Sequence, residues 1–269
     1  MAYWKALCFA FLLIWTWTAV PGSAVAAGVP EGTLEEIHWG VALLSVPAQP
    51  GKRYDVSLMD KDQGLEKLKT AFNLIAVNSP YSLRQIQRLK DAGTVALVYD
   101  PNYPPRTLDK IIAASFFPHY FDPSGSDPAK RVFLAVVGRH GIKWPVKELA
   151  AVLAHELVGH GIQRLEGRIE GSRQLDTECE AWLYEELAYQ DLKMDKKAKE
   201  MVQFRQELER IHCSDFKRHM AKTMPENLAL WDVLNPDVPR LLSYFKIYRE
   251  GQAVKSAGQG KQSQPSRAQ

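Results

Sequence analysis

The sequence predicts an α+β protein in which a small N-terminal sheet with helices precedes an all-α C-terminal half. Apolar runs of strand length occur in the first half, at residues 37–47, 94–101 and 131–141. From Asp176 to about Glu250, the apolar residues have helical spacing almost throughout. Strands gathered ahead of a run of helices are typical of the α+β class.

The first 27 residues have the composition of an export signal. Lys5 precedes an apolar run at residues 6–20, and Pro21-Gly22 ends this run before an A-x-A sequence at Ala24-Val25-Ala26. A positive charge, a short apolar core and small residues at the cleavage site define a secretory signal peptide. We therefore assign residues 1–27 to a cleaved signal, which leaves no stable membrane span. The alternative is an uncleaved membrane anchor, although such a helix needs about 20 apolar residues.

The elements of the first half are predicted from apolar spacing and boundary residues. Residues 37–47 indicate a strand or a buried extended segment, and residues 64–76 have helical spacing. A second helix is predicted over residues 79–93, which begin with a Ser, keep apolar residues on one face and end at a Gly. Strand 94–101 ends in a Pro-rich turn. The six prolines of residues 101–130 then predict a long surface loop or short irregular pieces.

Strand 131–141 leads directly into the segment with the most informative chemistry. A helix is predicted over residues 144–161, with Pro145 in its first turn, where the missing N–H costs nothing. Two interpretations of residues 132–137 stay open. The strand is either an edge on which an extended peptide adds as another strand, or it is fully buried.

The predicted helix contains the sequence His155-Glu156-Leu157-Val158-Gly159-His160. Two imidazoles beside a glutamate on one helix can hold Zn²⁺ while the carboxylate reaches an activated water. The histidines are five residues apart, a spacing that directs them about 140° apart in an ideal helix. A π-bulge would bring them together, and Gly159 and Gly161 each weaken a regular helix by about 1 kcal/mol relative to Ala. We therefore expect a local departure from α geometry here.

A zinc site needs a third protein ligand, because two nitrogen ligands leave it incomplete. Glu178 is the predicted ligand, since it lies at the start of the next helix. The 17 residues between His160 and Glu178 are enough to turn the chain back over the metal. In this arrangement zinc activates a water molecule, and Glu156 is the general base that takes its proton and then protonates the leaving amine.

These two motifs resemble those of the dipeptidyl peptidase III family of zinc peptidases. The segment from His155 to His160 is similar to the family's H-E-L-L-G-H, and Thr177-Glu178-Cys179-Glu180-Ala181 is similar to its E-E-C-R-A-E. In that family the Glu before the Cys is the third zinc ligand, which implies the same role for Glu178. The resemblance also implies a zincin-like, gluzincin-type fold. It covers about 30 residues, and Glu180 replaces the family's arginine, so it implies a similar metal site without dipeptide-releasing activity.

Several residues near the predicted ligands are candidates for supporting roles. Asp176 and Glu180 have carboxylates suited to orienting a ligating histidine, and solvated helix-cap charges are the alternative. An oxyanion that develops on the substrate needs a further hydrogen-bond donor. The downstream helices offer four candidates, for each of which a surface or core position is the alternative: Tyr184, Tyr189, His212 and His219.

The sequence therefore predicts an exported zinc-dependent metallopeptidase, periplasmic or secreted, that acts on a peptide or protein substrate. The alternative is a non-catalytic metal-binding or scaffold protein of the cell envelope with a zincin-like fold. Nucleic-acid binding is not expected, because Lys and Arg are interleaved with Asp and Glu and form no basic stripe.

One domain is predicted over residues 28–250. Residues 251–269 are polar, rich in Gly, Ser and Gln and without an apolar face, which is typical of a disordered tail. Once the signal is removed, Cys179 and Cys213 remain in a compartment where disulfides form. A disulfide between them and two separate buried thiols both stay open as interpretations.

Overall fold

The computed structural model describes residues 28–105, 112–122, 131–169, 172–233 and 235–260. Within these residues the α+β class is confirmed, with a five-stranded sheet in the first half and helices throughout the second. The predicted signal at residues 1–27 lies outside the described residues. In the described part of the chain, no helix has the length and apolar content needed to cross a membrane.

The sheet has the strand order β1-β2-β3-β5-β4. Its three central strands are parallel, and both edge strands run antiparallel to their neighbours. The strands are β1 (Leu34–His38), β2 (Val41–Ser45), β3 (Thr94–Asp100), β4 (Ala114–Phe116) and β5 (Val132–Gly138).

The segment predicted as one strand at residues 37–47 is instead divided between β1 and β2. These strands form a hairpin in which His38 pairs with Val41. The two intervening residues, Trp39 and Gly40, have positive φ values of 53° and 73°. Positive φ at both central residues is the requirement of a type I′ turn, which joins antiparallel strands with the native twist. The apolar run hid this turn, because Trp39 carries no turn signal of its own.

Of the two open interpretations of residues 132–137, the edge strand is wrong and the buried strand is correct. β5 pairs with β3 on one side and with β4 on the other, so its hydrogen-bonding groups are used on both sides. The edge of the sheet on this side is β4, which lies in the region predicted as a loop with short irregular pieces. A three-residue strand is too short to give a periodic signal.

The α-helices of the described residues lie in the predicted regions: those expected at residues 64–76, 79–93 and 144–161 begin and end within a few residues of these bounds, and those of the second half fall in the stretch of helical spacing, for which no separate bounds were predicted. They are α1 (Lys61–Asn78), α2 (Pro80–Ala92), α3 (Val146–Leu153), α4 (Gly161–Leu165), α5 (Gln174–Asp191), α6 (Lys199–Glu207), α7 (Ser214–Thr223) and α8 (Val238–Gly260), with short 3₁₀ turns at Gly141–Lys143 and Pro225–Trp231 and π turns at Ala154–His160 and Leu208–His212.

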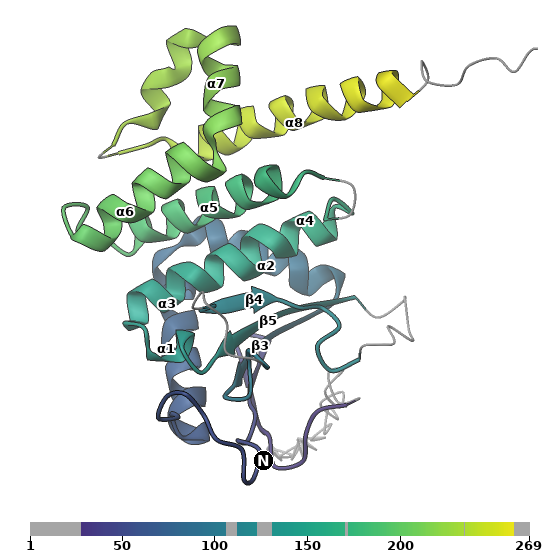
Figure 1. The fold of residues 1–269 in the computed structure, drawn as a ribbon, viewed down its shortest axis with the longest axis vertical. Coiled ribbons are helices and arrows are strands. Elements are labelled where there is room, and N and C mark those ends of the chain that lie inside the picture. The colour runs from purple at the N-terminus through teal and green to yellow at the C-terminus, as the bar shows by residue number, and fades with distance from the viewer. Residues whose placement is uncertain (1–27, 106–111, 123–130, 170–171, 234, 261–269) are drawn as a thin grey trace, which may run out of the picture.

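The helix that carries the predicted motif is the central element of the molecule. It consists of α3, the π turn at Ala154–His160 and α4, and we refer to it as the motif helix. Figure 1 shows it between the sheet and α5, with α6, α7 and α8 beyond α5. The motif is therefore held from two sides, by the sheet and by the first helix of the C-terminal half.

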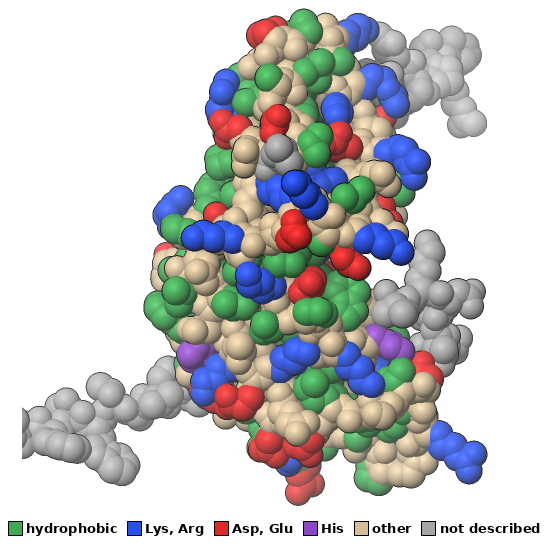
Figure 2. All heavy atoms as spheres, turned by 90° about the vertical axis from the view of Figure 1, so that its left-hand side faces the viewer, with side chains coloured by type: hydrophobic (Ala, Val, Ile, Leu, Met, Phe, Trp, Pro, Cys, Tyr) green, Lys and Arg blue, Asp and Glu red, His purple; other side chains and the backbone are tan. Residues whose placement is uncertain are grey.

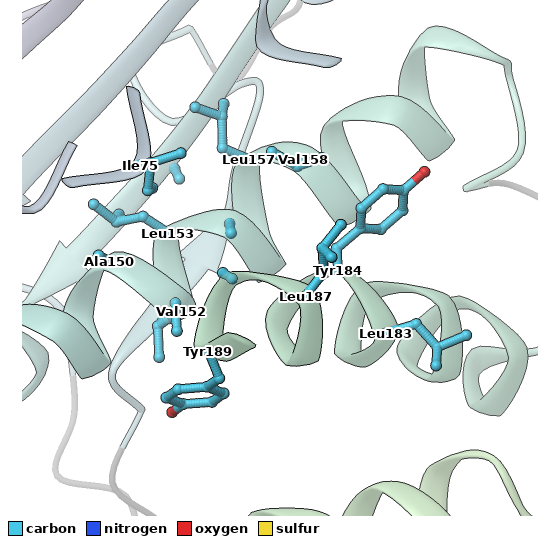
Figure 3. Packing of buried hydrophobic residues seen from close by; sticks show 14 of the residues in the cluster. Ile75, Ala150, Val152, Leu153, Leu157, Val158, Leu183, Tyr184, Leu187 and Tyr189 are labelled. Atoms are coloured by element: carbon cyan, nitrogen blue, oxygen red, sulfur yellow. The ribbon is translucent and has the colours of Figure 1, made fainter. Parts of the chain in front are cut away.

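Apolar side chains fix the motif helix in this position. Leu153 and Leu157 are fully buried, and Figure 3 shows Leu153 directed toward Ile75 of α1. Each buried aliphatic side chain of this size contributes about 1.5–3 kcal/mol by leaving water. In the same view, Tyr184 and Tyr189 project to opposite sides of α5. The motif helix thus belongs to the core, and its polar residues are held by rigid packing.

The prediction of a disordered tail over residues 251–269 is wrong for residues 251–260. α8 continues to Gly260, so residues 251–260 are helical, and the rest of the predicted tail lies outside the described residues. The polar composition misled the prediction, because a helix already started by an apolar segment extends by one hydrogen bond per added residue.

Charged side chains of both signs are interspersed on the face shown in Figure 2. This mixture agrees with the nearly balanced composition of 34 basic and 31 acidic residues. The face shown carries no basic stripe of the kind that would follow a phosphate backbone.

Candidate metal centre

The motif helix departs from α geometry at the predicted place. Residues Ala154–His160 form a π turn, in which backbone hydrogen bonds join residues five apart. Residues at this spacing then lie on one face, and the ring centroids of His155 and His160 are 5.1 Å apart. The prediction that a local distortion compensates for the five-residue spacing is confirmed.

Gly159 allows α5 to lie directly against this turn. A Cβ atom at Gly159 would lie 2.7 Å from both Cα and Cβ of Ala181, closer than carbon atoms approach in folded proteins. The glycine therefore serves a close approach of two backbones. This approach brings Glu178, one turn before Ala181 on α5, to the histidines.

The three predicted ligands converge. Glu178 Oε2 lies 3.5 Å from His155 Nε2, and Glu178 Oε1 lies 3.9 Å from His160 Nε2. One ligand atom from each residue lies within 4.8 Å of the others. Tetrahedral zinc with bonds of about 2.0–2.2 Å places its ligand atoms about 3.4 Å apart. Two imidazoles and one carboxylate would fit this ion if the distances between their ligand atoms shortened slightly. They would leave a fourth position for water or substrate.

The ionisable groups of the site influence one another strongly. Burial alone would lower the pKa of His155, but the carboxylates of Glu178 and Glu185 raise it to about 10. Burial raises the pKa of the Glu156 carboxyl, against the opposing effect of the two histidines. Burial would also raise the pKa of Glu178, but His155 and His160 hold it below its usual value. The buried histidine and the two glutamates are therefore coupled electrostatically.

Glu156 stands beside the ligands without being one of them. Its side chain is 12% exposed, and its Oε2 lies 4.0 Å from His160 Nε2. A carboxyl whose pKa is raised by burial can accept a proton and later return it. This position is the one expected of a general base.

The outer nitrogen of each histidine has a partner that the sequence analysis did not identify. His155 Nδ1 lies 3.0 Å from Glu185 Oε2, and His160 Nδ1 lies 2.9 Å from Gln163 Oε1. Such contacts fix the orientation of a ligating ring. One signal was available for Glu185, because a residue seven positions after Glu178 lies on the same helix face.

Of the two carboxylates predicted to orient the histidines, neither contacts a histidine directly. Asp176 accepts hydrogen bonds from Arg173 and, at 3.3 Å, from Tyr248, which corrects the predicted role. Glu180 pairs with Arg168 through both carboxylate oxygens and also accepts a hydrogen bond from Gln163 Nε2 at 3.2 Å. Glu180 therefore acts on His160 indirectly, by holding the Gln163 side chain that contacts this histidine.

Two of the four predicted oxyanion donors lie elsewhere. The ring of Tyr184 packs against Tyr81 at 6.1 Å, on the side of α5 opposite to Tyr189. His219 packs against Tyr248 at 5.1 Å, at the junction of α7 and α8. Both side chains take part in packing away from the site. The predictions failed because the sequence did not specify the direction in which each side chain points from its helix.

The other two predicted donors border the site. His212 stacks on Trp182 with ring centroids 4.3 Å apart, and the Trp182 ring lies 6.1 Å from that of His155. Burial lowers the pKa of His212, and Glu178 opposes this effect. Tyr189 lines a cavity that also contains His155 and Glu156.

A disulfide joins Cys179 to Cys213, so the first of the two open interpretations is correct. Cys179 follows Glu178 and Cys213 follows His212, so the bridge links the ligand-bearing turn of α5 to the segment before α7. Closing a loop of this length restricts the unfolded chain and contributes on the order of 3–4 kcal/mol.

Two cavities meet at the candidate centre. The smaller, of about 490 Å³, is lined by all three predicted ligands and Glu156. The larger, of about 770 Å³, shares His155 and Glu156 with it. β4 runs along both, since Ala114 lines the larger cavity and Phe116 the smaller. The candidate centre therefore lies in the middle of a cleft bordered by the sheet edge.

Comparisons with known proteins add no relative. No protein-family model, no curated protein and no solved structure matches this chain. The function of this chain is therefore inferred from the residues and geometry of the site itself.

Proposed function

We propose that this protein is a zinc-dependent metallopeptidase that hydrolyses peptide bonds with Glu156 as general base. The observation that carries the proposal is the π turn, which places His155 and His160 beside Glu178 within the reach of one ion. Two histidines, a carboxylate and a free fourth position are the usual donor set of catalytic zinc.

Each residue of the site has a role in this proposal. His155, His160 and Glu178 would hold the metal, and Glu185 and Gln163 would orient the two rings. When bound, zinc supplies a Lewis acid that polarises the scissile carbonyl and activates a water molecule. Glu156 accepts the proton of the attacking water and delivers it to the leaving amine. Of the predicted donors for the negative charge that develops on the substrate, Tyr189 lines the larger cavity and His212 stacks on Trp182, which lines it too.

The cleft supports a peptide as the substrate. In the described part of the sheet β4 is the edge strand on this side, which is where an extended peptide would add as another strand. The Phe116 ring of β4 lies 6.4 Å from that of His160. A peptide extended along β4 would therefore place one of its bonds beside the metal centre and Glu156.

The same observations support a zincin-like fold and an exported protein. A small sheet precedes the motif helix and helices follow it, which is the order implied by the resemblance to dipeptidyl peptidase III. The disulfide between Cys179 and Cys213 supports an oxidising compartment, since such bonds rarely persist in the cytosol.

Metal analysis of the purified protein tests the proposal. We expect about one equivalent of zinc in the wild type and a loss of affinity of several orders of magnitude in His160→Ala and Glu178→Ala, because each change removes one of only three ligands. His219→Ala, which alters a histidine away from the site, should retain the metal. Zinc retained in both ligand variants, or absent from the wild type after incubation with zinc and dialysis, would contradict the proposal.

Glu185→Gln should weaken zinc binding by about 10–100-fold without removing a ligand. The amide preserves the size of the side chain but no longer favours the Nδ1–H form of His155 as strongly. Competition with a chromophoric chelator measures the dissociation constant. An unchanged constant would show that packing alone orients His155.

A further inference from the structure

The larger of the two cavities at the candidate centre has a lining unlike that of the smaller one. It is bordered by α3, α5, α6 and the residues leading into β4, and it shares His155 and Glu156 with the metal centre. A substrate group that enters it therefore lies next to the bond being cleaved. Its lining decides which side chains are accepted there.

The lining is acidic. Four glutamates border the cavity. Glu185 contacts His155 Nδ1, and the other three are Glu148 of α3 and Glu200 and Glu207 of α6. None of the described lining residues is Lys or Arg, and in the described part of the chain these three carboxylates form no ion pair. The smaller cavity, by contrast, includes Arg164. The two halves of the cleft thus differ in charge.

The two carboxylates of α6 belong to one stripe of that helix. Glu200, Gln203 and Glu207 are spaced by three and four residues, so they share the face that borders the cavity. Both glutamates are exposed to solvent in the open cleft. A cation that enters the cavity would face them together with Glu148.

Aromatic rings form much of the remaining wall. Trp144, Trp182, Tyr189 and Phe204 line the same cavity, and Trp182 stacks on Phe204 at 4.9 Å. Such faces pack against aliphatic stems and attract cations through the π system. Lysine and arginine side chains combine an aliphatic stem with a cationic head, so they match both parts of this lining.

The direction of β4 indicates which part of a bound peptide would lie in this cavity. β4 runs from Ala114, in the larger cavity, to Phe116, in the smaller one. Antiparallel addition, the slightly more stable form of strand pairing, puts the residues that follow the cleaved bond beside Ala114. The acidic cavity then accepts the C-terminal side of the cleaved bond.

We infer that the substrates are peptides with a lysine or arginine directly after the cleaved bond, held by Glu148, Glu200 and Glu207 and by the aromatic wall. This inference rests on the proposed peptidase function and names its substrate class. The carboxylates act on binding and specificity, and the bond-breaking step still depends on Glu156.

Cleavage of matched peptides by the zinc-loaded full chain tests the inference. The probes are internally quenched peptides that differ only in having Lys, Arg, Gln or Leu after the bond cleaved, with the cleavage position mapped by mass spectrometry. We expect kcat/KM for Lys and Arg to exceed that for Gln by on the order of tenfold, since several carboxylates each add a modest attraction. The preference should decline between about 0.05 and 0.5 M salt.

The double variant Glu200→Gln/Glu207→Gln should reduce this preference to about twofold. Glu35→Gln/Glu226→Gln, which removes the same charge at exposed positions outside both cavities, should leave it unchanged. Cleavage without a preference for basic residues, a preference on the N-terminal side, or a preference that survives the α6 variant would each overturn the inference.

Binding separates this inference from the peptidase proposal. Fluorescence anisotropy reports the affinity of the labelled Lys and Gln peptides for the zinc-loaded chain, whether or not they are cleaved. Tighter binding of the Lys peptide that depends on Glu200 and Glu207, without hydrolysis, would contradict the peptidase and support the acidic site. Hydrolysis that is indifferent to these glutamates would contradict the acidic site alone.

Discussion

Glu156→Gln is expected to leave zinc bound and to reduce kcat for peptide hydrolysis by about 10²–10⁴-fold, the usual contribution of a general base. Glu156 is not among the converging ligand atoms, so its replacement by an isosteric amide preserves the metal site. An amide cannot take the proton of the attacking water. The measurement combines zinc content with initial rates on a mixed peptide library.

This variant also separates the enzyme from the scaffold alternative. A metal-binding scaffold of the cell envelope predicts zinc in both proteins and no hydrolysis that depends on Glu156. Glu226→Gln, an exposed change away from the cleft, is the matched control and should retain full activity. Equal hydrolysis by the wild type and Glu156→Gln would mean that the cleavage comes from a contaminant or from a different site.

Gly159→Ala should destabilise the protein and lose zinc affinity at the same time. The added Cβ would lie 2.7 Å from the Cα of Ala181, and backbone at this position has no rotamer with which to move away. Overpacking of this kind costs about 1–3 kcal/mol, which exceeds the gain of about 1 kcal/mol from replacing a helical Gly by Ala. A displaced α5 carries Glu178 away from the histidines. Denaturant unfolding and zinc titration measure the two effects.

Gly161→Ala is the matched control in the same helix. A Cβ at Gly161 would lie 2.8 Å from Cδ1 of Leu89, the end of a buried side chain and not backbone as at Gly159. The same gain in helix propensity then offsets the cost, and we expect a change within about 1 kcal/mol and unaltered zinc binding. Equal losses in both variants would show that the glycines serve the flexibility of the turn and not the approach of α5.

The sequence predicted much of the site because its signals are local. The five-residue step between His155 and His160, together with Gly159, required a π turn for the rings to meet, and the structure has that turn. Glu178 followed from ligand counting and chain length, and it lies beside both histidines. Helical spacing predicted the helical content of the second half, whereas the break between α5 and α6 was not predicted.

Contacts between distant segments were predicted less well. Asp176 was chosen to orient a histidine because of its closeness in sequence to Glu178, whereas Glu185, two turns after Glu178 on α5, contacts His155. Tyr184 and His219 have side chains that can donate a hydrogen bond, but these side chains point away from the site and pack elsewhere. The sequence left open whether β5 is an edge strand or a buried one, and it gave no sign that the three-residue β4 forms the edge.

By itself, the sequence of this protein determined the class of fold, the distorted turn and the identity of the converging residues. These depend on backbone propensity, apolar periodicity and metal chemistry, which act over a few residues. Only the tertiary structure decided which partners orient the histidines, which strand borders the cleft and where the acidic cavity lies. These depend on how α5, α6 and β4 pack against the motif helix, and packing between segments far apart in the chain leaves no local pattern.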